Sequence, residues 1–142
     1  MMVNNKRPLF LLEEELTYKL RGIFIEISRT HGYSYKEKVY QNILANKFKN
    51  YKINFVQYPF IPVINTETGN LIDKYIPDFL VENKIIVEIK AQRYIADIHI
   101  NQLVRYLHST KYEIGFLVNF GSPKVEIIRR IYTNDRKPFL LR

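Results

Sequence analysis

The segment PDFLVENKIIVEIK, residues 77–90, decides how the sheet of this chain is built. Its apolar and β-branched residues lie on both sides of a short polar stretch, which predicts a β-hairpin with its turn at residues 82–84. Side chains alternate between the two faces of a strand, so Glu88 and Lys90 share one face and the residues between and before them occupy the other. The second strand is therefore apolar on one side and partly charged on the other.

A hairpin centred on Asn83 places Asp78 directly opposite Glu88 on the same face. Two carboxylates at about 5 Å repel by about 3 kcal/mol at an effective dielectric constant of about 20. A divalent cation such as Mg²⁺ would offset this repulsion, and Lys90 would neutralise part of it. The alternative is an ordinary ion-paired hairpin in which Lys90 bridges to either carboxylate at a wet surface. The apolar neighbours of each charge favour a functional site.

Outward from the hairpin, the apolar pattern predicts the remaining elements. Helical spacing indicates a helix over about residues 12–30 and a second one from Ser34, a possible cap, to about Asn50. Residues 53–64 and 71–81 predict strands, although Pro59 and Pro62 indicate an edge strand or a bulge in the first. A helix over residues 95–109 and strands over 112–119 and 125–132 follow. The order αα-βββ-α-ββ predicts an α/β fold with helices packed on a mixed sheet.

The composition restricts the class of protein. A chain of 142 residues is expected to form a single domain, residues 1–142, with 1–10 as a mobile arm and 133–142 as a tail. It has no cysteine, which excludes disulfides and thiolate zinc sites and fits a reducing cytoplasm. No apolar run approaches the roughly 20 residues that span a bilayer, so no membrane association is expected. The net charge of +8 indicates a polyanionic partner such as nucleic acid, or alternatively reflects AT-rich codons.

Five stretches occur in order along the chain: SYKEKVY at 34–40, YIPD at 75–78, IVEIKA at 86–91, HINQLVRYL at 99–107 and NFG at 119–121. Together they resemble the small prokaryotic GxxExxY proteins of the PD-(D/E)XK nuclease superfamily, over about residues 17 to 132. The resemblance implies a restriction-endonuclease-like α/β/α core with a mixed sheet. One departure is that Ser34 stands where the family has glycine, three residues before Glu37.

The resemblance implies hydrolysis of phosphodiester bonds in DNA with Mg²⁺ or Mn²⁺. The metal would be held by Asp78, Glu88 and the backbone carbonyl of Ile89, and Lys90 would orient the attacking water and stabilise charge on phosphorus. By the same resemblance, Glu37 and Gln102 are expected to complete the catalytic site.

Two of these assignments have a competing structural interpretation. Ser34 and Glu37 also form an S-x-x-E capping box, which would make Glu37 a helix cap instead of a metal-facing carboxylate. Gln102 lies one helical turn from both Ile98 and Tyr106, so we expect it to face the sheet, either at the site or as a satisfied core amide. His99 is a weaker candidate for the wall of the site.

Two other functions are compatible with the same fold. One is a structure-selective nuclease of the Holliday-junction type, which would be basic and a homodimer. The other is a non-catalytic module that binds nucleic acid or a protein partner, with salt-sensitive binding and no metal-dependent turnover.

Overall fold

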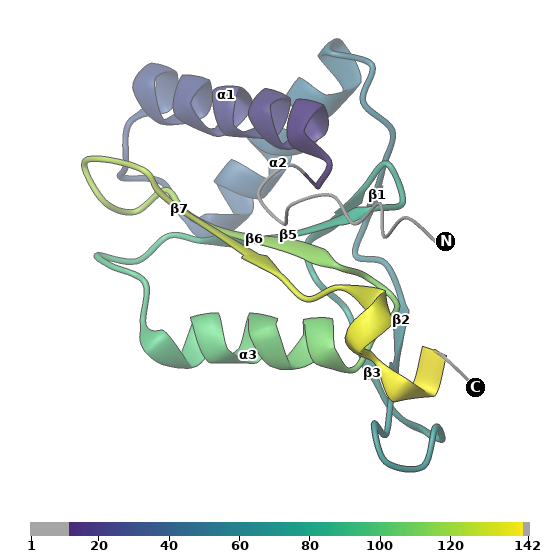
Figure 1. Ribbon diagram of the computed structural model, residues 1–142. Coiled ribbons are helices and arrows are strands. Elements are labelled where there is room, and N and C mark those ends of the chain that lie inside the picture. Colours follow the sequence, from purple (N-terminus) through teal and green to yellow (C-terminus); the bar gives the residue numbers. More distant parts are fainter. Residues whose placement is uncertain (1–11, 141–142) are drawn as a thin grey trace.

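The computed structural model describes residues 12–140 and contains the helices and strands in the expected sequence order (Figure 1). The helices are α1 (Glu14–His31), α2 (Glu37–Asn50) and α3 (Asp97–His108). The strands are β1 (Phe55–Gln57), β2 (Ile61–Ile64), β3 (Leu71–Tyr75), β4 (Phe79–Val81), β5 (Ile85–Lys90), β6 (Ile114–Asn119) and β7 (Glu126–Ile131). Two short 3₁₀ turns, Asn134–Arg136 and Pro138–Leu140, follow β7.

A five-stranded mixed sheet forms the middle layer. Its strand order is β1-β4-β5-β6-β7, with β5 and β6 parallel and the other neighbours antiparallel. Helices α1 and α2 cover one face and α3 covers the other (Figure 1). The predicted α/β/α core with a mixed sheet is therefore confirmed. A separate two-stranded ribbon, β2 with β3, lies beside this sheet.

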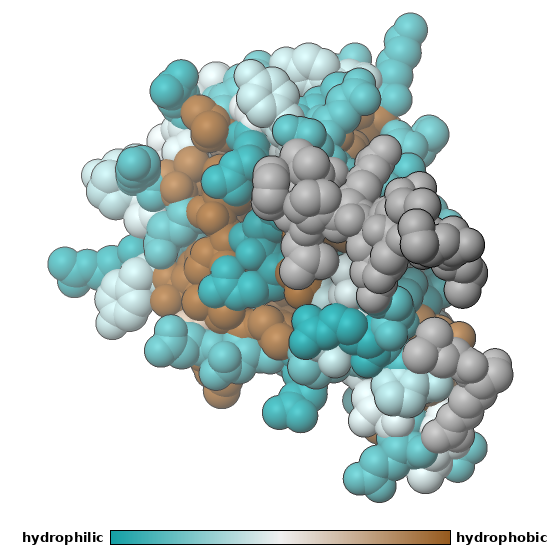
Figure 2. Space-filling model, viewed as in Figure 1, coloured by the Kyte–Doolittle hydropathy of each residue, from teal (hydrophilic) through white to brown (hydrophobic). Residues whose placement is uncertain are grey.

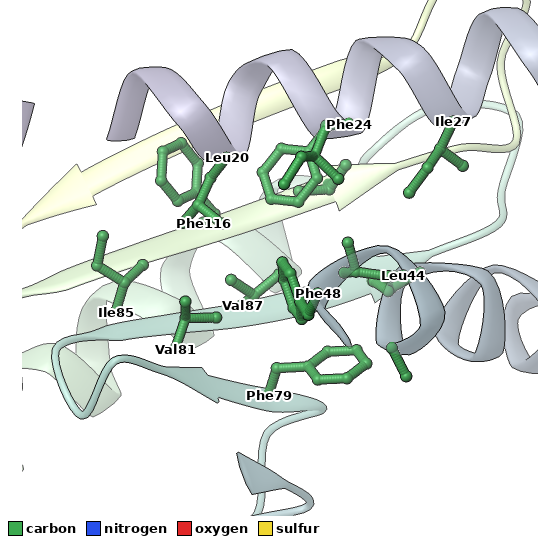
Figure 3. Close-up of a cluster of buried hydrophobic side chains, with 14 of the residues drawn as sticks. Leu20, Phe24, Ile27, Leu44, Phe48, Phe79, Val81, Ile85, Val87 and Phe116 are labelled. Carbon is green, nitrogen blue, oxygen red and sulfur yellow. The ribbon is translucent and has the colours of Figure 1, made fainter. Parts of the chain in front are cut away.

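Alternation along β5 divides the core into two clusters. Ile85, Val87 and Ile89 belong to the cluster under α1 and α2, where Phe24 and Phe116 make an edge-to-face contact at 5.7 Å (Figure 3). Ile86 belongs to the cluster on the opposite face, with residues of α3 and of the β2–β3 ribbon. Both faces of the central strand are thus covered, as in sheets flanked by helices.

Two expected strands are each broken in the structure. The run 53–64 is interrupted after Gln57, where Tyr58 adopts a φ of 55°, and its halves join different sheets. The run 71–81 is interrupted at residues 76–78 in the same way. Pro59 and Pro77 lie at these breaks and have no N–H to donate to a ladder. The expected three strands between α2 and α3 are therefore five.

A buried lysine helps to fix the segment after β7. Lys137 is 1% exposed, and its Nζ donates to the carbonyls of Thr110 and Tyr112 at 2.9 and 2.7 Å. Burial lowers the pKa of this ammonium to about 8. The expected mobile arm at residues 1–10 and the last two residues of the tail lie outside the described residues.

The outer strands are β1 and β7. Apolar residues reach the surface along β7, between the helical layers (Figure 2), where Ile127 and Ile128 are half-buried.

Within residues 12–140, no helix is both long and apolar enough to cross a membrane.

Candidate active site

Acidic side chains meet where β4 begins and β5 ends. Phe79 pairs with Val87, and this register places Asp78, one residue before β4, opposite Glu88. The turn length thus predicted the pairing of the two carboxylates correctly. Glu88 lies on the α3 side of the sheet, two residues after Ile86.

Asp78 is held by two donors from different elements. The backbone N–H of Ile89 donates to Asp78 Oδ2 at 2.7 Å, and Gln41 Nε2 donates to Oδ1 at 2.9 Å. Burial nevertheless raises the pKa of Asp78, and the two hydrogen bonds and the charge of Lys90 oppose that shift. The β4–β5 ladder ends at Phe79 and Val87, and continuing its register places Ile89 opposite Pro77, which has no N–H to offer to the Ile89 carbonyl.

Gln41 connects Asp78 to a tyrosine and a lysine. Its side chain is 6% exposed, and its Oε1 accepts a hydrogen bond from the Tyr58 hydroxyl at 2.6 Å. That hydroxyl in turn accepts from Lys38 Nζ at 2.6 Å. Sequence reasoning missed Gln41 and Tyr58. Gln41 lies four residues after Glu37, one helical turn, and that spacing was the available signal.

Glu37 is the first residue of α2 and lies beside Gln41, whose Nε2 is 3.5 Å from Glu37 Oε1. Burial and the negative charge of Asp78 raise its pKa, whereas Lys90 lowers it. The N-cap residue is Lys36, and no side chain caps the helix. The capping-box interpretation of Ser34 and Glu37 is therefore wrong, because the helix starts two residues later than that motif requires.

Glu88 is the carboxyl with the largest upward shift among these acids. Burial, together with the negative charges of Asp78 and Glu37, raises its pKa to about 7, while Tyr75 and Lys90 oppose this shift. The hydroxyl of Tyr75 is buried beside Glu88, and the same environment raises the pKa of Tyr75. This hydroxyl completes no hydrogen bond within the usual distance and angle limits. The Tyr75 hydroxyl is therefore a buried polar group without a well-formed hydrogen bond, and it lies next to the Glu88 carboxyl.

Lys90 is close enough to three carboxyl groups to affect their pKa values, but it forms no ion pair with them. Its charge lowers the pKa of Glu37, Asp78 and Glu88. In the part of the chain that the structure describes, however, Lys90 forms no salt bridge within 4.0 Å. The expected alternative of an ion-paired hairpin bridged by Lys90 is thus not what the structure contains.

Of the two candidates on helix α3, the weaker one, His99, lies near Lys90, and Gln102 does not face the sheet. Gln102 is exposed, so the prediction that it faces the sheet is wrong. Leu103 and Leu107 form the buried face of α3 instead, and Ile98, which was assigned to that face, is 71% exposed. His99 is half-buried, and burial together with the charge of Lys90 lowers its pKa. His99 is therefore the α3 side chain within electrostatic range of Lys90.

The loop after Lys90 is fixed by the NFG stretch. Asn119 Oδ1 accepts from the Gln92 N–H at 2.9 Å, and its Nδ2 donates to the Gln92 carbonyl and to Glu126. A Cβ on Gly121 would collide with the backbone of Gln92, so this position requires glycine. These contacts fix the direction of the chain as it leaves the carboxylate pair.

No cluster of three or more acidic, histidine or cysteine side chains with metal-binding geometry is present within residues 12–140. A metal at this site would therefore rest on two carboxylates, backbone oxygen and water. Such a ligand set is typical of Mg²⁺, which keeps several waters.

The family model of the PD-(D/E)XK nuclease superfamily matches residues 14–131. The matched range includes every element from α1 to β7 and all of the residues that converge here. No curated protein and no solved structure gives a significant match.

Proposed function

We propose that this chain, which belongs to the PD-(D/E)XK nuclease superfamily, is a metal-dependent nuclease that hydrolyses phosphodiester bonds of DNA. We assign it, within that superfamily, to the small GxxExxY proteins. The observation that carries the proposal is the convergence of Asp78, Glu88 and Lys90 at the end of β5, with Lys90 free of salt bridges to described residues.

The oxygen atoms at this point suit a hard divalent cation. Asp78 and Glu88 supply carboxylate oxygens from opposite positions of the hairpin, and the Ile89 carbonyl lacks a ladder donor because the continued register places Pro77 opposite it. The charge of the buried Glu88 carboxylate is unfavourable unless a cation or a proton compensates it. Mg²⁺ or Mn²⁺ would bind Asp78, Glu88 and the Ile89 carbonyl, and when bound would polarise the phosphate and lower the pKa of a water ligand.

Each remaining side chain has a role that follows from its contacts. Lys90 would hold the attacking water or stabilise the charge that develops on the phosphoryl oxygens. Gln41 positions the Asp78 carboxylate through its 2.9 Å hydrogen bond. Glu37 keeps the site acidic from the α2 side, and its raised pKa makes it a candidate to accept a proton. Gln102 is not carried into this proposal, because its exposed side chain does not face the sheet.

Net charge agrees with a phosphate-rich substrate. The chain carries 22 Lys and Arg against 14 Asp and Glu, and three of those acids are at this site. The excess positive charge would draw DNA toward the protein by long-range electrostatic attraction. The carboxylates of Asp78 and Glu88 would hold the cation.

Cleavage of supercoiled plasmid and of labelled oligonucleotides in Mg²⁺ or Mn²⁺ tests the proposal. The expected result is cleavage that EDTA abolishes and that Asp78→Ala and Lys90→Ala each remove. Glu15→Gln, an exposed substitution on α1, is the matched control and should retain activity. Cleavage that persists in both site variants would overturn the assignment. Salt-sensitive DNA binding without any cleavage would favour the non-catalytic binding module.

A further inference from the structure

Two exposed aromatic residues lie on the segment that joins β1 to β2, and the first of them contacts the backbone of Asp78. Tyr58 is 43% exposed and Phe60 is 63% exposed. The backbone N–H of Tyr58 donates to the carbonyl of Asp78 at 2.9 Å, so this segment runs alongside the site. In the β2–β3 register Ile61 pairs with Tyr75, which places Phe60 opposite Ile76, another exposed apolar residue.

Each of these two rings has a lysine ammonium close to it. Lys38 Nζ lies 4.8 Å from the centre of the Tyr58 ring, and Lys74 Nζ lies 5.9 Å from that of Phe60. Both distances are within the range of cation–π attraction. Lys38 and Lys74 are themselves exposed, so their ammonium groups remain available to an anion. The segment thus combines apolar ring surface with positive charge.

Tyr58 also has a backbone conformation that a tyrosine adopts at a cost. Its φ of 55° lies in the left-handed region, where glycine or asparagine is less strained. The hydrogen bonds from its hydroxyl to Gln41 and from Lys38 hold the ring in place next to Asp78. The aromatic segment is therefore joined to the site through both backbone and side chain.

We infer that Tyr58, Phe60 and Ile76, with Lys38 and Lys74, form a platform for unpaired bases of the DNA substrate. This inference rests on the proposed function, which it narrows to single-stranded or locally unpaired DNA. Exposed rings bind bases by stacking, and lysines beside them bind the intervening phosphates. In a duplex the bases are already stacked on one another, so the same rings gain little from it.

Fluorescence anisotropy in EDTA tests the platform without any contribution from cleavage. The probes are a labelled oligodeoxythymidylate, an abasic strand of the same length and phosphate count, and a duplex of that length. The platform predicts tightest binding to the oligodeoxythymidylate, and Phe60→Ala should weaken that binding about tenfold with little effect on the abasic strand. Phe60→Tyr, which retains a ring, should restore it.

Tyr18→Ala is the matched control, because Tyr18 is 82% exposed on α1, a helix that contributes no side chain to the site. Equal affinity for the thymidylate and abasic strands would overturn the inference, as would equal effects of Phe60→Ala and Tyr18→Ala. Circular dichroism of each variant confirms that it is folded. Base-dependent binding without metal-dependent cleavage would refute the proposed function alone. Cleavage without any preference for unpaired DNA would refute the platform alone.

Discussion

Replacing Glu88 by glutamine should stabilise the metal-free protein above neutral pH. The folded chain holds the Glu88 proton up to about pH 7, whereas the carboxyl in the unfolded chain releases it near its ordinary value of 4.5. The folded state therefore binds more protons between these pH values, and stability falls as pH rises through that window. Below about pH 4.5 Glu88 is protonated in both the folded and the unfolded state, so folding no longer buries its charge.

The shift from 4.5 to about 7 corresponds to about 3 kcal/mol of stability that is lost by pH 8. Glutamine keeps the shape of the side chain and has no charge to bury, so Glu88→Gln should gain much of this amount at pH 8 and almost nothing at pH 4.5. Urea unfolding in EDTA at several pH values measures the difference. Glu15→Gln, an exposed control, should stay within about 0.5 kcal/mol of the wild type throughout.

A loss of stability in Glu88→Gln at pH 8, or a difference from wild type that does not vary with pH, would refute this reasoning. Mg²⁺ provides an independent check, because an ion that binds only the folded state stabilises the wild type at pH 8. That stabilisation should be much smaller in the glutamine variant.

Three further predictions concern Gln41, Gly121 and Lys137. Gln41→Ala removes a donor to Asp78 and should weaken Mg²⁺ or Mn²⁺ binding by about 10–100-fold in calorimetry; unchanged affinity would argue against a positioning role. Gly121→Ala should destabilise the fold by several kcal/mol in thermal unfolding because its Cβ would strike the loop after β5, whereas Gly22→Ala, with open space around it, should be neutral or stabilising. Lys137→Met leaves two backbone carbonyls unpaired and should lower stability by about 2–4 kcal/mol at pH 7. In the wild type the lowered pKa of this lysine predicts stability that rises between about pH 8 and 10.5, and a flat profile there would contradict the assigned burial.

The hairpin was predictable because its information is local. Alternation along residues 85–90 and the length of the turn fix both the faces and the register, and the structure pairs Phe79 with Val87 accordingly. Glu88 and Asp78 could therefore be placed opposite each other from the sequence. The breaks in the two expected strands were less visible, because a β-rich run carries no signal for which of two sheets each half joins.

The helix residues at the site were harder to predict. Ile98 looks like part of the buried stripe of α3, and Gln102 was assigned to the sheet with it, but Leu103 and Leu107 form that stripe. Gln41 was missed because its partner, Asp78, is 37 residues away in sequence and only the fold brings them together. The spacing of one helical turn between Glu37 and Gln41 was the available signal in the sequence.

Anomalous diffraction from crystals soaked in Mn²⁺ tests the central claim most directly. The account predicts an anomalous peak between the carboxylates of Asp78 and Glu88, within coordination distance of the Ile89 carbonyl, and its loss in Asp78→Ala. Crystals of the wild type without a peak at this position, at a Mn²⁺ concentration that supports DNA cleavage, would contradict it.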